Sequence, residues 1–115
     1  MDDMYVEFDK ARRLRLTLKG AKTLSRLCDG RGLIVINQKL AEFDIDTLER
    51  VLFAAMVDDE PTLTLNLTGK RVADYFAREH SLVPLFTAAV KTIDASGLFN
   101  QPTEPEGNGT AATAT

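Results

Sequence analysis

The stretch VEFDKARRLRLTLKGAKTLSRL, residues 6–27, determines how the N-terminal part of the chain folds. Its first half alternates between apolar and charged residues, which is typical of a half-buried β-strand. Its second half repeats apolar residues every three or four positions, which is typical of a helix. The apolar positions 4, 6 and 8 match the apolar positions 14, 16 and 18 across a short polar segment. The pattern therefore predicts a β-hairpin followed directly by a helix.

The apolar pattern also predicts the register of this hairpin. A three-residue loop, residues 10–12, places Phe8 opposite Leu14, whereas a slip of one residue would mix the apolar and charged faces. The two exposed ion pairs of this register should contribute only about 0.2–1 kcal/mol each. These ion pairs are Glu7 with Arg15 and Asp9 with Arg13, and the remaining apolar pairs are Val6 with Leu16 and Met4 with Leu18.

The same stretch is strongly basic. Half of the 14 lysines and arginines of the chain fall between Lys10 and Arg26, with no acidic residue among them. A basic patch can bind nucleic acid, but this one lacks interleaved aromatic residues for base stacking, and the net charge of the chain is -3. A solvated strand and helix face is the favoured interpretation, with nucleic-acid binding as the minor alternative.

Length and composition limit the class of protein. With 115 residues, of which 44% are hydrophobic, the chain can build one domain with one modest core. Its single cysteine, Cys28, excludes an internal disulfide and is typical of a reducing compartment. No stretch approaches the roughly 18 apolar residues of a membrane span, and the start MDD is unlike a signal peptide. We therefore expect a cytoplasmic protein with no membrane contact.

Helical periodicity dominates the chain after the hairpin. The first helix is expected from about Gly20 to Cys28, and residues 33–43 are ambiguous between strand and helix, with helical spacing favoured. The clearest helix follows a capping box that starts at Asp46, and residues 62–68 alternate like a strand or an extended connection. The expected apolar stripes are Leu33, Ile36, Leu40 and Phe43; Leu48, Val51, Leu52, Ala55 and Met56; Val72, Ala73 and Phe76; and Leu82, Leu85, Phe86, Ala89, Val90 and Ile93.

These segments predict an α+β fold in which an N-terminal β-hairpin packs on a small bundle of four to five helices. We expect residues 1–98 to form this single domain. Residues 99–115 are rich in Pro, Gly, Thr and Ala and, beyond Phe99, contain no large apolar residue. Such a segment cannot bury enough surface to offset the entropy of ordering, so a disordered, flexible polar tail is expected there.

The sequence offers few residues for chemistry. His80 is the only histidine and lies in a polar junction between two expected helices, without an assignable nucleophile or orienting carboxylate. Cys28 lies on an apolar stripe, where cysteine usually behaves as a small hydrophobic residue. The acids at 58–60 lack the ligand spacing of a calcium loop. We expect no enzyme activity, no cofactor, no metal and no small-molecule substrate.

Two aromatic residues are candidates for contact with a partner protein. Phe53 and Tyr75 each lie off the main apolar stripe of the expected helix. They can be flanking core residues, or they can belong to an apolar surface that binds another chain, where aromatic residues are favoured.

The order of these segments resembles the tail assembly chaperones of long-tailed bacteriophages and their relatives in gene transfer agents. The resemblance rests on residues 6–27, on the glycine pair at positions 30 and 32, and on AEFDIDTLERVLFAAMVDDEPTLTL at residues 41–65. Members of that family open with a short strand pair and an apolar helix that ends at glycine. A polar helix start, an apolar helix and an acidic link with proline then follow. The resemblance covers about residues 5–96 and carries no catalytic motif.

This resemblance implies a non-enzymatic role in the assembly of viral tails. Such chaperones bind and solubilise the tape measure protein, self-associate, and help to recruit the tail tube protein, in some cases through a form extended by a ribosomal frameshift. They act in the cytoplasm of the infected or lysogenic host and are absent from the mature virion.

Two other functions remain open from the sequence alone. One is a structural tail protein, a tube or terminator subunit, that is retained in the virion. A tube subunit usually needs extensive strands, whereas helical periodicity dominates this chain. The other is a small nucleic-acid-binding or regulatory adaptor, which the negative net charge disfavours.

Overall fold

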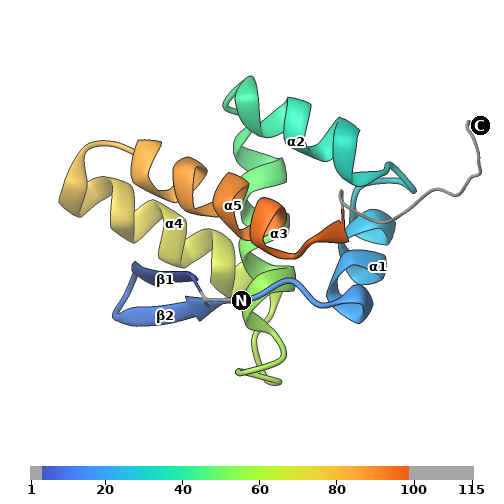
Figure 1. Cartoon of the computed structure of the whole chain (residues 1–115). Helices are drawn as coiled ribbons and strands as arrows, with labels where there is room; N and C mark the ends of the chain where they lie inside the picture. Colours follow the sequence, from blue (N-terminus) through green and yellow to red (C-terminus); the bar gives the residue numbers. More distant parts are fainter. Residues whose placement is uncertain (1–3, 99–115) are drawn as a thin grey trace, which may run out of the picture.

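The computed structural model describes residues 4–98 and shows a hairpin followed by five helices (Figure 1). The predicted α+β class is therefore confirmed. The predicted flexible tail, residues 99–115, lies outside the described residues. The elements are β1 (Met4–Glu7), β2 (Ala11–Leu14), α1 (Leu18–Leu27), α2 (Leu33–Ala41), α3 (Ile45–Met56), α4 (Leu65–Glu79) and α5 (Val83–Ala95).

Helix α3 lies at the centre of the fold. It contacts the other four helices and β2, and Figure 1 shows it passing between α1 and α4. Its predicted stripe is confirmed, because all five residues of that stripe are buried. Gly20 allows α1 to approach closely, since a Cβ at this position would lie 3.2 Å from the carbonyl oxygen of Ala54. The central helix therefore organises the core.

The start of α3 differs from the prediction. The N-cap is Asp44, two residues before the predicted Asp46, and its carboxylate accepts a hydrogen bond from the Thr47 amide at 3.3 Å. The Thr47 hydroxyl also donates to this carboxylate. Asp44 lies three residues before Thr47, and Asp46 lies three residues before Glu49. The local sequence is therefore compatible with either aspartate as the N-cap.

We expect Asp44→Ala to lower the free energy of unfolding by about 1 kcal/mol, because the first turn of α3 loses its side-chain acceptor. Asp44→Asn keeps an acceptor oxygen at the same position and should lose clearly less. Urea denaturation followed by circular dichroism measures both values. An equal loss in the two variants would show that the stabilisation comes from the charge and not from the acceptor.

Of two ambiguous segments, the first forms a helix and the second contributes only residues 65–68 to one. Residues 33–41 form α2, as favoured, with Ile36 and Leu40 buried. Residues 62–68 form no strand, because Thr64 caps α4 by accepting a hydrogen bond from the Leu67 amide at 3.0 Å. A side-chain cap in the middle of the alternating stretch thus starts a helix where alternation alone suggested extended chain.

The hairpin forms, but its predicted register is wrong. Its loop is residues 8–10, and the partner of each β1 residue moves by four positions along β2. The shift is even, so the faces of the paired residues stay as predicted, and Phe8, Leu14 and Leu16 are buried. The predicted inward position of Leu18 is wrong, because Leu18 begins α1 and is 63% exposed. The observed pairs are Met4 with Leu14, Tyr5 with Arg13, Val6 with Arg12 and Glu7 with Ala11.

Two contacts fix the hairpin in this register. After Leu14, the amide of Arg15 donates to the carbonyl of Ala55 on α3 at 3.1 Å, which attaches the end of β2 to the central helix. At the other end, the Phe8 ring enters the core beside Tyr75 of α4, with ring centroids 6.3 Å apart. Both contacts join residues that are far apart in the sequence, so the local alternation of apolar and charged residues cannot predict them.

The C-terminal helix agrees with the prediction. Pro84 lies in the first turn of α5, and Leu85, Phe86, Ala89 and Ile93 are buried. Gly97 follows the helix with a φ of 75°, which glycine adopts at low cost. Within residues 4–98, the length and apolar content of every helix fall short of what crossing a membrane requires.

Candidate functional site

The structure places Tyr75 in the core. Its side chain is 5% exposed, packs beside Phe8, and lies under the guanidinium of Arg78, 5.2 Å from the ring centroid. The expectation that Tyr75 lies off the core stripe is therefore wrong. The buried residues of α4 are Thr68, Val72 and Tyr75, so the helix is rotated relative to the predicted stripe, and Phe76 is left 51% exposed.

Phe53, the other predicted contact residue, is partly buried and packs against the core from α3. It therefore flanks the core, while part of its side chain stays accessible to a partner chain. Glu49 lies one helical turn before it, so the two side chains share a face of α3. This face borders α4.

Helix α4 leaves most of its surface open. Only three of its 15 residues are buried. Gly69, Ala73, Phe76 and Ala77 lie on one side of it, and we call this set the α4 outer face. Phe76 provides a half-exposed aromatic ring, and the small residues around it allow another helix to approach the backbone closely.

A shallow groove of about 670 Å³ runs beside this face, between α3 and α4. Gly69 forms its closest point, because a Cβ there would lie 3.2 Å from the Oε1 atom of Glu49. The residues that line this α3–α4 groove are Glu49, Leu65, Asn66, Gly69 and Lys70.

The Glu49 carboxylate is the distinctive polar group of the groove. It makes no hydrogen bond or ion pair with any residue in the described range 4–98. Burial, with a smaller contribution from the Asp46 carboxylate, raises the pKa of Glu49. Nearby Arg50 offsets this increase only in part, so a partly desolvated carboxylate of this kind is suited to a cationic side chain of a partner.

A second exposed apolar surface lies where α2 meets α3. Phe43 is 58% exposed, and its ring meets Phe86 edge to face with centroids 5.1 Å apart. Ile45 is exposed beside it. We call this surface the α2–α3 corner; it comprises Lys39, Glu42, Phe43, Asp44, Ile45 and Asp46, which line a hollow of about 410 Å³.

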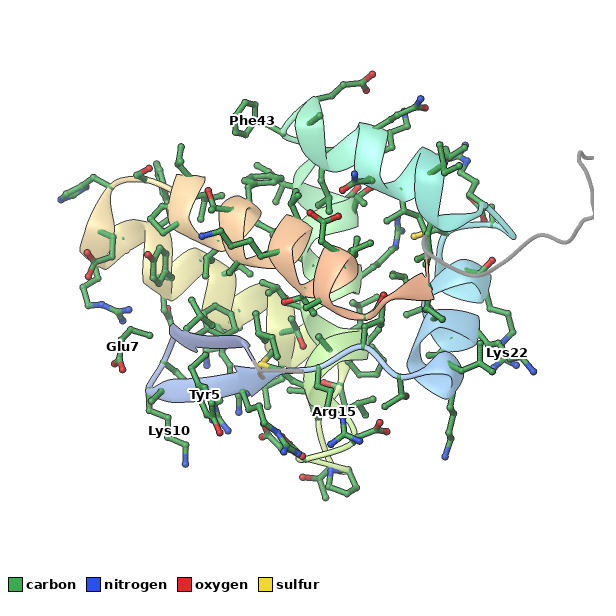
Figure 2. The ribbon with its side chains drawn as sticks, viewed as in Figure 1. Tyr5, Glu7, Lys10, Arg15, Lys22 and Phe43 are labelled. Atoms are coloured by element: carbon green, nitrogen blue, oxygen red, sulfur yellow. The ribbon has the colours of Figure 1, made fainter. Side chains whose placement is uncertain are left out.

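The backbone of Phe43 is strained. Its φ is 61°, two residues after the end of α2, where the amide of Phe43 donates to the carbonyl of Leu40 and the amide of Asp44 donates to the carbonyl of Lys39. Glycine usually occupies this position, and Asp and His tolerate it. Asp29 and His80 hold the equivalent positions after α1 and α4. An aromatic residue here is unusual and points the ring outward at a conformational cost (Figure 2).

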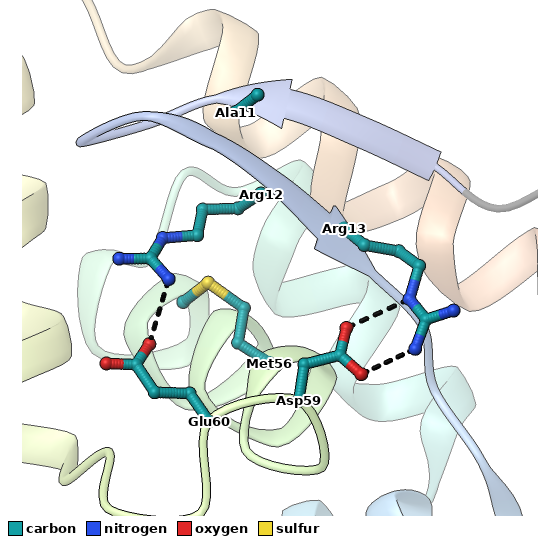
Figure 3. Close-up of a pocket in the computed structure, with 6 residues that line it drawn as sticks. All are labelled: Ala11, Arg12, Arg13, Met56, Asp59 and Glu60. Carbon is teal, nitrogen blue, oxygen red and sulfur yellow. Dashed lines mark hydrogen bonds and ion pairs between the residues drawn. The ribbon is translucent and has the colours of Figure 1, made fainter.

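Two basic residues of the hairpin, Arg12 and Arg13, form ion pairs within the fold (Figure 3). Arg12 contacts Asp9 at 2.6 Å and Glu60 at 3.2 Å, and the Nε of Arg13 donates to Asp59 at 2.9 Å. The predicted pairs of Glu7 with Arg15 and Asp9 with Arg13 are wrong, because the register places these residues apart. The expectation that two hairpin arginines have acidic partners is nevertheless confirmed, with different partners.

The residues considered for chemistry occupy structural positions. His80 ends α4 in the left-handed region and is exposed, as expected for a helix-terminal histidine. Cys28 is buried, and burial raises the pKa of its thiol. Among residues 4–98, no group of three or more His, Cys, Asp and Glu side chains could hold a metal ion.

Sequence reasoning missed the exposure of two aromatic rings, those of Phe43 and Phe76. Both were assigned to buried stripes because they continue a helical spacing. For Phe43, the signal was the following Asp44, a good N-cap that ends the preceding helix early and takes Phe43 out of it. For Phe76, the adjacent Tyr75 offers an equally good core residue, and only packing on the hairpin selects between them.

Comparisons with models of known protein families, with curated proteins and with solved structures find no match for this chain.

Proposed function

We propose that the protein is a non-enzymatic tail assembly chaperone of a long-tailed bacteriophage or a related gene transfer agent. It binds and solubilises the tape measure protein and helps to recruit the tail tube protein, in the cytoplasm of the infected or lysogenic host. The observation that carries the proposal is the α4 outer face, an open helix surface with a half-exposed Phe76 beside the α3–α4 groove.

This surface suits a long helical partner. A helix packs on another helix when side-chain ridges enter grooves, and small residues such as Ala73 and Ala77 provide room for the approach. Phe76 supplies an aromatic anchor, and aromatic residues contribute much of the energy of protein contacts. The surface is modest in size, so each contact is weak enough to be released when tube protein replaces the chaperone.

Glu49 adds selectivity to this contact. A partner that places Lys or Arg over the groove would compensate a carboxylate that has no ion-pair partner within residues 4–98. The preferred segment is therefore an amphipathic helix with basic residues next to its apolar stripe.

Co-expression with the tape measure protein of the same tail gene cluster tests this function. We expect the chaperone to keep most of that protein soluble, and Phe76→Asp to reduce the soluble fraction by about tenfold, because a charged group would face the apolar stripe of the partner. The readout is the amount of tape measure protein in the supernatant after centrifugation. Glu49→Gln should give a smaller reduction.

Tyr5→Asp is the matched control, because Tyr5 is also an exposed aromatic residue but lies on the hairpin. It should leave the soluble fraction unchanged. A wild-type protein that fails to keep the tape measure protein soluble would refute the proposal. Stoichiometric recovery of the protein from purified tails would favour a structural tail subunit, and salt-sensitive binding to DNA would favour a nucleic-acid adaptor.

A further inference from the structure

A glycine inside α4 is unexpected for the stability of that helix. Gly69 lies in the interior of α4, and its φ is outside the left-handed range that glycine adopts more easily than other residues. Glycine in a helix interior is less favourable than alanine, because it loses more backbone freedom on folding. The backbone of α4 therefore gives no reason for a glycine at position 69.

Helix packing gives no reason for it either, as a comparison with Gly20 shows. At Gly20, the atom closest to an added Cβ is the carbonyl oxygen of Ala54, which is part of the α3 backbone and cannot move away. At Gly69, the three closest atoms all belong to the carboxyl group of Glu49, at 3.2, 3.3 and 3.4 Å. This group is the end of a flexible side chain. The missing side chain of Gly69 thus makes room for the Glu49 carboxyl group and not for a neighbouring helix.

The Glu49 carboxylate in this space is also unfavourable in the free protein. It makes no hydrogen bond or ion pair with a residue in the range 4–98, although Lys70 lines the same groove. Burial, and to a smaller extent Asp46, raises the pKa of Glu49, and Arg50 offsets this increase only in part. A glycine that weakens its helix and a carboxylate that is partly out of water therefore meet at one contact. Local choices of this kind are expected mainly at functional sites.

We infer that Gly69 is a specificity-determining residue of the α3–α4 groove: it keeps the Glu49 carboxylate in the groove wall, where that carboxylate selects a partner helix with a lysine or arginine at the contact. The inference rests on the proposed binding of a helical partner at this surface. Leu65 lines the same groove and contacts the apolar stem of the incoming side chain, while its cationic group pairs with Glu49.

The position of the carboxylate determines the strength of this ion pair. Against Gly69, the Glu49 carboxylate has already lost part of its water, so a cation meets it in less polar surroundings, where the attraction is stronger than at the open surface. A methyl group at position 69 would push the carboxylate toward the solvent. Ion pairs in the solvent are screened and contribute little. Gly69 therefore sets the selectivity of the groove through the position of Glu49.

The test uses the full-length protein and two capped helical peptides of about 20 residues that share one leucine stripe. One peptide carries a lysine beside the stripe, and the other carries norleucine there, which matches the lysine stem without its charge. In fluorescence anisotropy at about 50 mM salt, we expect the wild type to prefer the lysine peptide by about tenfold. Gly69→Ala and Glu49→Gln should each reduce this preference to less than about twofold. The double variant should lose no more, because both residues act through one contact.

Two further measurements separate this role from a purely structural one. Gly69→Ala should leave the urea midpoint of unfolding unchanged or raise it, because alanine favours the helix and the Glu49 side chain can move aside. A carbon-13 NMR titration should show the pKa of Glu49 falling toward its ordinary value in this variant, since the carboxylate returns to water while Asp46, Arg50 and Lys70 are kept. A lower midpoint, or an unchanged pKa of Glu49, would show that Gly69 serves packing instead.

Ala73→Ser is the matched control, because it adds one atom to the α4 outer face one turn after Gly69. It should change the affinities for both peptides alike and leave the preference for lysine intact. Failure of the wild type to bind either peptide, equal affinity for the two, or an unchanged preference in Gly69→Ala would overturn the inference. These results leave open whether the protein keeps the tape measure protein soluble through Phe76. Conversely, an insoluble tape measure protein together with an intact preference for lysine would refute the chaperone function alone.

Discussion

Phe8→Ala is expected to lower the free energy of unfolding by about 3–5 kcal/mol, the largest effect of any single substitution considered. The Phe8 side chain is 1% exposed, and its ring packs beside Tyr75 of α4. Alanine would lose this contact and leave a cavity that the surrounding side chains cannot fill. A loss of this size is a large part of the stability of a domain of about 100 residues.

Phe8 is also the point at which the hairpin loop is attached to α4. The Nη2 of Arg78 donates a hydrogen bond to the Phe8 carbonyl at 2.6 Å, and the same guanidinium lies over the Tyr75 ring. Removing the ring therefore weakens the position of the whole loop. A two-stranded sheet is marginal without such packing against other elements.

Tyr5→Ala is the matched control for this prediction. Tyr5 is an aromatic residue of the same hairpin but is 64% exposed, so its loss should change stability by no more than about 0.5 kcal/mol. Urea denaturation of both variants measures the difference. Similar losses in the two variants would contradict the burial of Phe8 and the side of the hairpin that faces the core.

The hairpin shows which part of the fold can be predicted from sequence. Alternation specifies the face of each residue, so the burial of Phe8, Leu14 and Leu16 was predicted correctly. Alternation does not specify the register, because every even shift keeps the same faces inward. The actual register depends on the contact of Arg15 with Ala55 and of Phe8 with Tyr75, which join residues far apart in the chain.

The candidate surfaces were harder to predict, for the same physical reason. An apolar residue at helical spacing is buried only if another element covers that side of the helix. Helix α4 packs on α3, and its Tyr75 meets Phe8 of the hairpin loop, so Tyr75 is buried while Phe76, one position later, is exposed. Phe53 lies on the well-covered α3, where it is partly buried and packs against the core, as a flanking core residue does.

The ion pairs around Arg71 connect parts of the chain that no local pattern brings together. Arg71 of α4 contacts Glu60 at 2.7 Å and Asp9 at 3.5 Å, and Arg12 of β2 contacts the same two carboxylates. The group therefore joins the hairpin loop, β2, the connection after α3, and α4. The Arg71 side chain is only partly accessible to water, so its contacts are screened less than those of surface pairs.

Arg71→Met is expected to lower the free energy of unfolding at pH 7 by about 1–3 kcal/mol, because Glu60 and Asp9 lose a shared cation while methionine keeps much of the apolar stem. The adjacent exposed Lys70→Met is the control and should change stability by no more than about 0.5 kcal/mol. Chemical denaturation at a series of pH values measures both.

The pH dependence identifies the cause of this loss. The pKa of Asp9 is lowered from 3.8 to about 2, mainly by the hydrogen bond from Arg12 and also by the charge of nearby Arg71. For Glu60, the hydrogen bond from Arg71 is the largest cause that lowers the pKa. Because both folded-state pKa values lie below the unfolded ones, the stabilisation is present above the unfolded values and is lost as the pH falls; the part that comes from Asp9 is lost as the pH falls through about 2. The difference between wild type and Arg71→Met should shrink over the same range, since protonated carboxyl groups no longer need the cation. A difference that stays constant down to pH 2 would instead assign the effect of Arg71 to packing of its side chain.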